Sequence, residues 1–193
     1  MRIWTTHSLP FWNRLQEQGV VRCDTDLSCW ASDFKEAYDW MADQMTRRIG
    51  PAPFPEVQYP IWGWRQVGSY KKEYHGSLTD CGGEEDEFVF ITADIPDHLV
   101  LLSDFDLWHC VLNHSYADYI KHRHEPDEEA AIVKSWENIF NLDQRGHSIR
   151  HRRNRSIQAT FWELRAEWVT GTTRIKGFQR WKQQDLEKWG ARE

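Results

Sequence analysis

The most regular pattern of apolar and polar positions predicts a helix over residues 34–49. Apolar side chains recur there at intervals of three and four, so they lie on one stripe of an α-helix. The stripe consists of Phe34, Ala37, Tyr38, Met41, Ala42, Met45 and Ile49. Gly50 and Pro51 follow, a pair that ends a helix. We expect the stripe to pack into the hydrophobic core.

Shorter apolar runs along the rest of the chain predict strands and three further helices. The expected strands cover residues 2–6, 61–65, 87–95, 99–102, 156–164 and 172–178, and residues 20–22 are expected to be extended. The expected helices lie between Ser8 and Gly19, over residues 105–114 after a cap at Ser103 or Asp104, and over residues 127–140. Strands and helices do not alternate regularly, which favours an α+β fold over a doubly wound sheet.

Length and composition predict a single globular domain over residues 1–193. Hydrophobic residues make up 40% of the chain and charged residues 28%, which excludes a disordered protein. No apolar stretch reaches the roughly 20 residues that a membrane helix needs. The first residues turn polar too early for the apolar run of an export signal. We therefore expect a soluble, cytoplasmic protein that makes no membrane contact.

Charge is distributed unevenly along the chain. Residues 147–193 contain 11 Lys or Arg and 5 Asp or Glu, a net charge of +6, whereas the preceding residues carry −12. The densest basic run covers residues 147–155, and its guanidinium groups suit the phosphates of a nucleic acid. The same run also fits a solvated loop, or a segment that docks on the acidic part of its own chain.

Tryptophan is unusually abundant, with 12 residues among 193. Some of the indoles must lie in the core because they bury a large apolar area, while others could line a pocket for flat groups such as nucleobases. A metal site is not expected. His109, Cys110 and His114 would lie on one helix, but they lack the paired spacing of a structural zinc site.

The strand over residues 158–163 has polar side chains that suit a binding site. Alternation places Gln158, Thr160 and Trp162 on one face and Glu163 on the other, unless a β-bulge turns the end of the strand. Glu163 is therefore either an ion-paired charge at the edge of the strand or a functional acid.

Six short segments resemble a bacterial family that is described only as a domain of unknown function. They are Trp4-Thr5-Thr6, Tyr38-Asp39-Trp40-Met41, Pro60-Ile61-Trp62-Gly63-Trp64, Leu101-Leu102-Ser103-Asp104-Phe105-Asp106-Leu107-Trp108, Ser135-Trp136-Glu137-Asn138-Ile139-Phe140 and Gln158-Ala159-Thr160-Phe161-Trp162-Glu163. Together they span nearly the whole chain. The family name implies no activity.

The order of elements also resembles that of the DarT-type ADP-ribosyltransferases, toxins that attach ADP-ribose from NAD to nucleobases. Four motifs bear the resemblance. They are Trp4-Thr5-Thr6 followed by Gly19, Trp62-Gly63-Trp64-Arg65, Ser103-Asp104, and the segment from Arg152 to Thr160. The resemblance implies an α+β, ADP-ribosyltransferase-like fold with split mixed or antiparallel sheets and flanking helices.

This resemblance also implies roles for individual residues. A carboxylate beside the ribose would stabilise the positive charge that develops when the nicotinamide bond of NAD breaks. Thr160 stands where the family has its catalytic glutamate, so Glu163 becomes the candidate carboxylate. Gln158 and Thr160 would position the ribose or the acceptor, and Arg65 would hold the NAD phosphates or the acceptor. The implied cofactor-binding set is Trp4, Thr6, His7, Trp62, Trp64 and Asp104, where Trp4 replaces the family's histidine.

On this basis we expect an NAD-dependent ADP-ribosyltransferase that modifies RNA or single-stranded DNA without a metal. Such an enzyme would be the toxin of a toxin–antitoxin or phage-defence system, with an antitoxin protein as its partner. Two alternatives stay open. One is a non-catalytic module that binds a nucleotide, and the other is an interaction subunit whose acidic part docks a basic protein.

Overall fold

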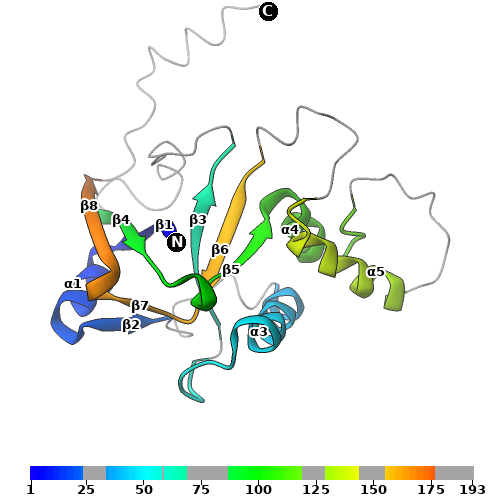
Figure 1. The fold of residues 1–193 in the computed structure, drawn as a ribbon, viewed down its shortest axis with the longest axis horizontal. Helices are drawn as coiled ribbons and strands as arrows, with labels where there is room; N and C mark the ends of the chain where they lie inside the picture. Colours follow the sequence, from blue (N-terminus) through cyan, green and yellow to red (C-terminus); the bar gives the residue numbers. More distant parts are fainter. Residues whose placement is uncertain (24–33, 58, 69–86, 119–128, 144–154, 177–193) are drawn as a thin grey trace, which may run out of the picture.

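The computed structural model of the chain describes residues 1–23, 34–57, 59–68, 87–118, 129–143 and 155–176 (Figure 1). These residues form a mixed α+β fold in which helices flank a mostly antiparallel sheet. The expected fold class is confirmed at this level.

The main sheet contains six strands in the order β5-β6-β3-β1-β4-β8. They are β1 (Arg2–Ser8), β3 (Ile61–Gln66), β4 (Glu87–Asp94), β5 (Leu101–Asp104), β6 (Ile157–Phe161) and β8 (Val169–Lys176). All neighbouring strands pair in antiparallel fashion. A second, two-stranded sheet pairs β2 (Val20–Arg22) with β7 (Glu163–Arg165).

In the described ranges, four α-helices connect these strands. They are α1 (Leu9–Gln18), α3 (Lys35–Ile49), α4 (Phe105–Leu112) and α5 (Glu129–Ser135), with short 3-10 helices at Asp97–Leu99, Trp136–Phe140 and Ala166–Trp168. Gly19 ends α1 as expected, because its φ of 75° is a left-handed conformation that glycine adopts without strain. Within the described ranges, no helix has the length and apolarity needed to cross a membrane.

The main sheet is nearly divided between β1 and β3. These strands share a single paired position, Trp4 with Trp64, whereas β1 pairs with β4 at every residue from Arg2 to Ser8. We call the junction of β1 and β3 the seam. Figure 1 shows β5, β6 and β3 on one side of it and β1, β4 and β8 on the other.

Close backbone contact holds the two halves together at the seam. A Cβ atom on Gly63 would lie 2.7 Å from Ile3 Cγ2 and 2.8 Å from the Trp4 carbonyl oxygen, so only glycine fits there. The Thr5 hydroxyl also donates a hydrogen bond to the Trp62 carbonyl oxygen, at 2.7 Å.

Two hydrophobic clusters form the core. One packs α1 against the sheet through residues that include Phe11, Leu15 and Ile91. The other joins α3, α4 and the 3-10 helix at Trp136–Phe140. The helix over residues 34–49 is confirmed as α3, and Ala37, Met41 and Met45 of its expected stripe are buried, together with Gln44.

The single strand expected over residues 156–164 is wrong. Strand β6 ends at Phe161, the chain bends at Trp162, and β7 begins at Glu163 in the other sheet. The buried Trp162 side chain explains the bend, because its Nε1–H donates a hydrogen bond to the Gly50 carbonyl oxygen at 3.0 Å and ties this point to the end of α3.

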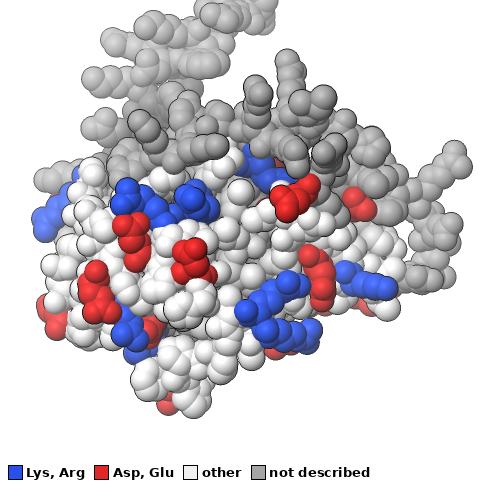
Figure 2. Space-filling view, in the orientation of Figure 1, with Lys and Arg blue, Asp and Glu red and all other residues white. Residues whose placement is uncertain are grey.

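Charged side chains of both signs are interspersed on the described part of the face in Figure 2. Residues 147–154 of the expected basic run lie outside the described residues. Arg155, the last residue of that run, is only 5% exposed and forms an ion pair with Asp104. Its guanidinium group therefore stabilises the fold and is not presented to a nucleic acid.

Candidate functional site

Six of the predicted site residues lie on one face of the main sheet. Trp4 pairs with Trp64, Trp64 with Gln158, and Trp62 with Thr160. Residues directly opposite in neighbouring strands share a face, as do residues two apart in one strand. We call this side of the sheet the seam face. Its predicted residues are Trp4, Thr6, Trp62, Trp64, Gln158 and Thr160.

A continuous row of paired residues crosses the seam face. Strand pairing runs from Trp4 on β1 through Trp64 and Gln158 to Ser103 on β5. From the sequence, Ser103 was expected only as a helix cap or as part of a motif before the helix. Its place in the row depends on the register between β5 and β6, and no local sequence pattern predicts that register.

Several polar atoms on this face are buried and have no hydrogen-bond partner. They are Trp4 Nε1, Thr6 Oγ1, Trp62 Nε1, Ser103 Oγ and Gln158 Oε1. An unsatisfied buried polar group costs about 1–3 kcal/mol, and native proteins leave few of them. The group provides two N–H donors, two hydroxyls and one amide oxygen, all uncharged. Its chemistry therefore suits a neutral, polar ligand.

Aromatic packing fixes the indoles on this face. The Trp62 ring lies 5.8 Å from the Tyr38 ring in an edge-on contact and 4.9 Å from the Trp108 ring. Trp64 makes an edge-on contact with Phe105 at 4.9 Å. Helices α3 and α4 thus hold the aromatic side chains of β3 in place.

Thr160 is fully buried and its hydroxyl already has a partner within the sheet. The hydroxyl donates to the Leu101 carbonyl oxygen at 3.3 Å. Thr160, which the DarT resemblance aligns with a catalytic glutamate, thus contributes to the pairing of β5 and β6.

His7 lies on the face opposite Trp4 and Thr6, so the structure does not bring it to the seam face. Its ring stacks on Phe11 of α1, with 3.7 Å between ring centroids. The Thr5 hydroxyl donates its proton to Trp62, so it accepts the hydrogen bond from His7 Nε2, at 2.9 Å. Burial lowers the pKa of His7 to about 3, which keeps the ring neutral.

Arg65 lies in a β-bulge at the end of β3. The pairing with β6 shifts register between Trp64 and Gln66, which leaves Arg65 as the additional residue. Its side chain is exposed. The pKa of Asp97 is lowered mainly by the N-terminal ammonium group and, to a smaller extent, by Arg65. The bulge therefore takes Arg65 out of the row of paired residues, and its charge is close enough to Asp97 to favour the ionised carboxylate.

The Asp104 carboxylate makes structural contacts within the fold. One carboxylate oxygen accepts a hydrogen bond from the Leu107 backbone N–H at 3.1 Å, which confirms the expected helix cap. The other oxygen forms the ion pair with Arg155. Asp104 is fully buried, and both of its carboxylate oxygens contact groups within the protein.

Glu163 is buried between two arginines. Arg22 Nη2 lies 2.9 Å from its Oε2, and Arg165 Nε donates to its Oε1 at 2.7 Å. The carboxylate lines a cavity of about 220 Å³. The other lining residues are Ile49, Pro51, Pro53, Leu99, Phe161, Trp162, Arg165 and Trp168. This cavity does not include Trp4, Arg65 or Gln158, so the structure separates the candidate carboxylate from the seam face.

One cluster of potential metal ligands joins α3, α5 and the end of α4. His114 Nδ1 lies 2.8 Å from Glu36 Oε2, and His114 Nε2 lies 2.7 Å from Glu129 Oε1. Hydrogen bonds to Glu129 and Glu36 raise the pKa of His114. One ligand atom from each of the three residues lies within 4.8 Å of the others, and each carboxylate contacts a different ring nitrogen. The arrangement fits a protonated imidazole between two helices.

The comparisons with known proteins address the family of this chain. No curated protein and no solved structure matched the sequence. Nothing in these comparisons links the chain to the DarT-type enzymes, so that resemblance stays a hypothesis. Residues 2–125, which include β1 to α4, match a family described as Domain of unknown function (DUF3841). Since this match covers more than half of the sequence, the chain belongs to the DUF3841 family.

Proposed function

We propose that the chain binds NAD, or a nucleotide derived from it, at the seam face and does not cleave it. The proposal rests on the unpaired buried atoms of Trp4, Thr6, Trp62, Ser103 and Gln158. Their shared face supports the proposal, because a single ligand could satisfy them together. The nearly divided sheet is also compatible with the split-sheet, ADP-ribosyltransferase-like fold that the sequence resemblance implies.

The chemistry of these atoms matches an amide or a nucleobase. The nicotinamide carboxamide has an oxygen that can accept from an indole N–H, and an NH₂ group that can donate to Gln158 Oε1. Adenine offers a comparable amino group and ring nitrogen acceptors. Flat rings of this kind stack on aromatic side chains, which Trp62 and Trp64 provide.

The ligand must displace atoms that now enclose the site. Trp4 is 3% exposed, Ser103 is fully buried, and Gln158 is 8% exposed. Binding therefore requires the side chains around the seam to move. We expect association to be slower than diffusion-controlled encounter for this reason.

We propose that NAD is not cleaved because of where Glu163 lies. Its two arginine partners neutralise the charge that would stabilise a cationic ribose, and it lies outside the row of paired residues. Thr160 has no carboxylate to replace it.

A second candidate is the transferase that the sequence resemblance implies. One observation favours it: Glu163 is a buried carboxylate in a cavity with Trp162 and Trp168, which could enclose a flat ring. The bond between ribose and nicotinamide would break there, and a nucleic acid would accept the ADP-ribose. An antitoxin protein would then be the expected partner.

Calorimetry and chromatography separate the two candidates. NAD, ADP-ribose and nicotinamide would be titrated into the protein, and NAD would then be incubated with the protein and total RNA or single-stranded DNA. We expect saturable binding without release of nicotinamide. Nicotinamide release that disappears in Glu163→Gln would favour the transferase. Failure of all three ligands to bind would contradict a nucleotide site at the seam face.

A further inference from the structure

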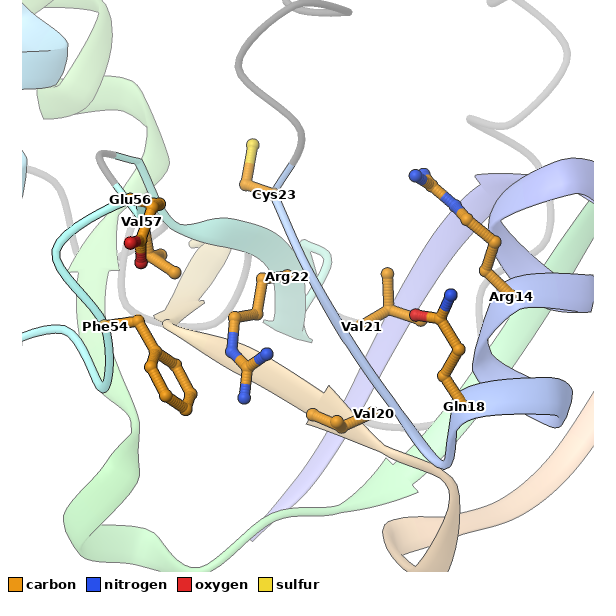
Figure 3. A pocket seen from close by; sticks show the side chains of 9 residues that line it. All are labelled: Arg14, Gln18, Val20, Val21, Arg22, Cys23, Phe54, Glu56 and Val57. Atoms are coloured by element: carbon orange, nitrogen blue, oxygen red, sulfur yellow. The ribbon is translucent and has the colours of Figure 1, made fainter.

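A larger cavity lies between α1, β2 and the segment that follows α3 (Figure 3). Its volume is about 480 Å³, within the range of about 300–1,000 Å³ that is typical of small-molecule sites. Its polar and aromatic lining comes from Arg14, Gln18, Arg22, Cys23, Phe54 and Glu56. None of these residues belongs to the seam face, and none was predicted as a site residue from the sequence.

Arg22 is held in this cavity from two sides. Its Nη2 contacts Glu163 Oε2 at 2.9 Å, and its guanidinium carbon lies 4.3 Å above the centre of the Phe54 ring. Its Nε is buried and has no hydrogen-bond partner. The guanidinium group is therefore fixed in position, and because the Arg22 side chain is still 30% exposed it can meet an acceptor in the cavity.

Phe54 is the second unusual feature of the cavity. Its side chain is 49% exposed, and among the described residues no other large hydrophobic side chain is classed as exposed. The arginine covers one side of its ring, and much of the remaining surface is open. An aromatic ring exposed in this way provides a stacking surface for a flat group.

The charged groups of the lining favour an anion. Arg14 on α1 and Arg22 on β2 contribute two guanidinium groups, against the carboxylate of Glu56. The Glu163 carboxylate also contacts Arg22, but it is shared with Arg165. Figure 3 shows Arg14 and Gln18 projecting from α1, with Phe54 and Glu56 across the cavity from them. Guanidinium groups match phosphate oxygens in charge and geometry, and the Gln18 amide adds further donors.

We infer that this cavity binds a nucleoside monophosphate. The phosphate lies between Arg14 and Arg22, the base stacks on Phe54, and the Glu56 carboxylate accepts hydrogen bonds from the ribose hydroxyls or the base. Tight binding requires that the ligand contain both an anion and a flat ring. Inorganic phosphate lacks the ring and a nucleoside lacks the anion, so both should bind more weakly. The inference is independent of NAD binding at the seam face.

Titration calorimetry of the full chain with AMP, adenosine and inorganic phosphate tests this inference. We expect AMP to bind at least about 10-fold more tightly than either fragment, since each fragment lacks one of the two contacts. Arg14→Gln and Phe54→Ala are each expected to weaken AMP binding by about 10-fold. The matched control is Arg47→Gln, which removes an exposed guanidinium on α3 and should leave AMP binding unchanged. Circular dichroism would verify that each variant folds.

Three results would overturn the inference. AMP could fail to bind, inorganic phosphate could bind as tightly as AMP, or both Arg14→Gln and Phe54→Ala could bind AMP like the parent protein. AMP binding that is lost in Ser103→Ala but kept in Arg14→Gln would place the nucleotide at the seam face. That outcome would overturn this inference while leaving the proposed function intact.

Discussion

At the scale of single residues, the stability of a Ser103 variant tests whether the buried hydroxyl belongs to a ligand site or to ordinary core. Its buried hydroxyl has no partner, so Ser103→Ala is expected to raise the free energy of unfolding by about 1 kcal/mol. Thr160→Val is the matched control, because its hydroxyl donates to Leu101 and its loss should lower stability by about 1 kcal/mol. Urea denaturation measures both changes. A loss of stability in Ser103→Ala would show that its hydroxyl is already satisfied.

His7 predicts a specific loss of stability in acid. Its pKa is about 3 in the folded protein and 6.5 in the unfolded chain, so only the unfolded chain gains a proton as pH falls between these values. The free energy of unfolding should therefore fall by up to about 1.4 kcal/mol per pH unit below pH 6.5. Denaturation of the parent and His7→Gln proteins between pH 7 and about 4 measures this contribution. Parallel curves for the two proteins would contradict the assignment.

At the scale of elements, the approach of β1 to β3 depends on Gly63. Gly63→Ala would place a methyl group against the Trp4 carbonyl oxygen, and we expect it to lower stability by about 1–3 kcal/mol. Gly171→Ala on β8 is the control, since its nearest contact would be 3.8 Å, an ordinary packing distance. Equal unfolding free energies for the two variants would show that the strands at the seam can separate without cost.

The contact between α3 and α5 predicts an opposite pH effect. The pKa of His114 is raised above 6.5, so its bridge between Glu36 and Glu129 is complete below that pH and is lost as pH rises through the raised value. Melting temperatures of the parent and His114→Gln proteins would be compared from about pH 6 to 9. We expect the stabilising difference to shrink with increasing pH and with added salt, because these side chains are largely exposed. A difference independent of pH would contradict this role.

The elements also show what could be predicted from sequence. The apolar stripe of α3, the glycine end of α1 and the cap at Asp104 are local features, and the structure confirms them. Alternation placed Gln158 and Thr160 on one face of β6, and the pairing agrees. The bend at Trp162 could not be predicted, because its indole bonds to Gly50, which lies 112 residues away in the chain.

At the scale of the whole molecule, register decides which predicted residues meet. Strand pairing brings Trp4, Trp64 and Gln158 into one row, and it adds Ser103, whose position no local pattern indicates. The departure of the chain into a second sheet takes Glu163 to Arg22 instead. Long-range pairing of this kind is invisible in single segments, so the sequence identified most members of the seam face but misjudged the carboxylate as their neighbour.

The central claim is that the seam face binds NAD, or a nucleotide derived from it, through its unpaired polar atoms. Calorimetric titration of NAD into the parent, Ser103→Ala and Thr160→Val proteins tests it most directly. We predict saturable binding to the parent, binding at least about 10-fold weaker for Ser103→Ala, and little change for Thr160→Val. The absence of binding to the parent, or equal affinity in the parent and Ser103→Ala proteins, would contradict it.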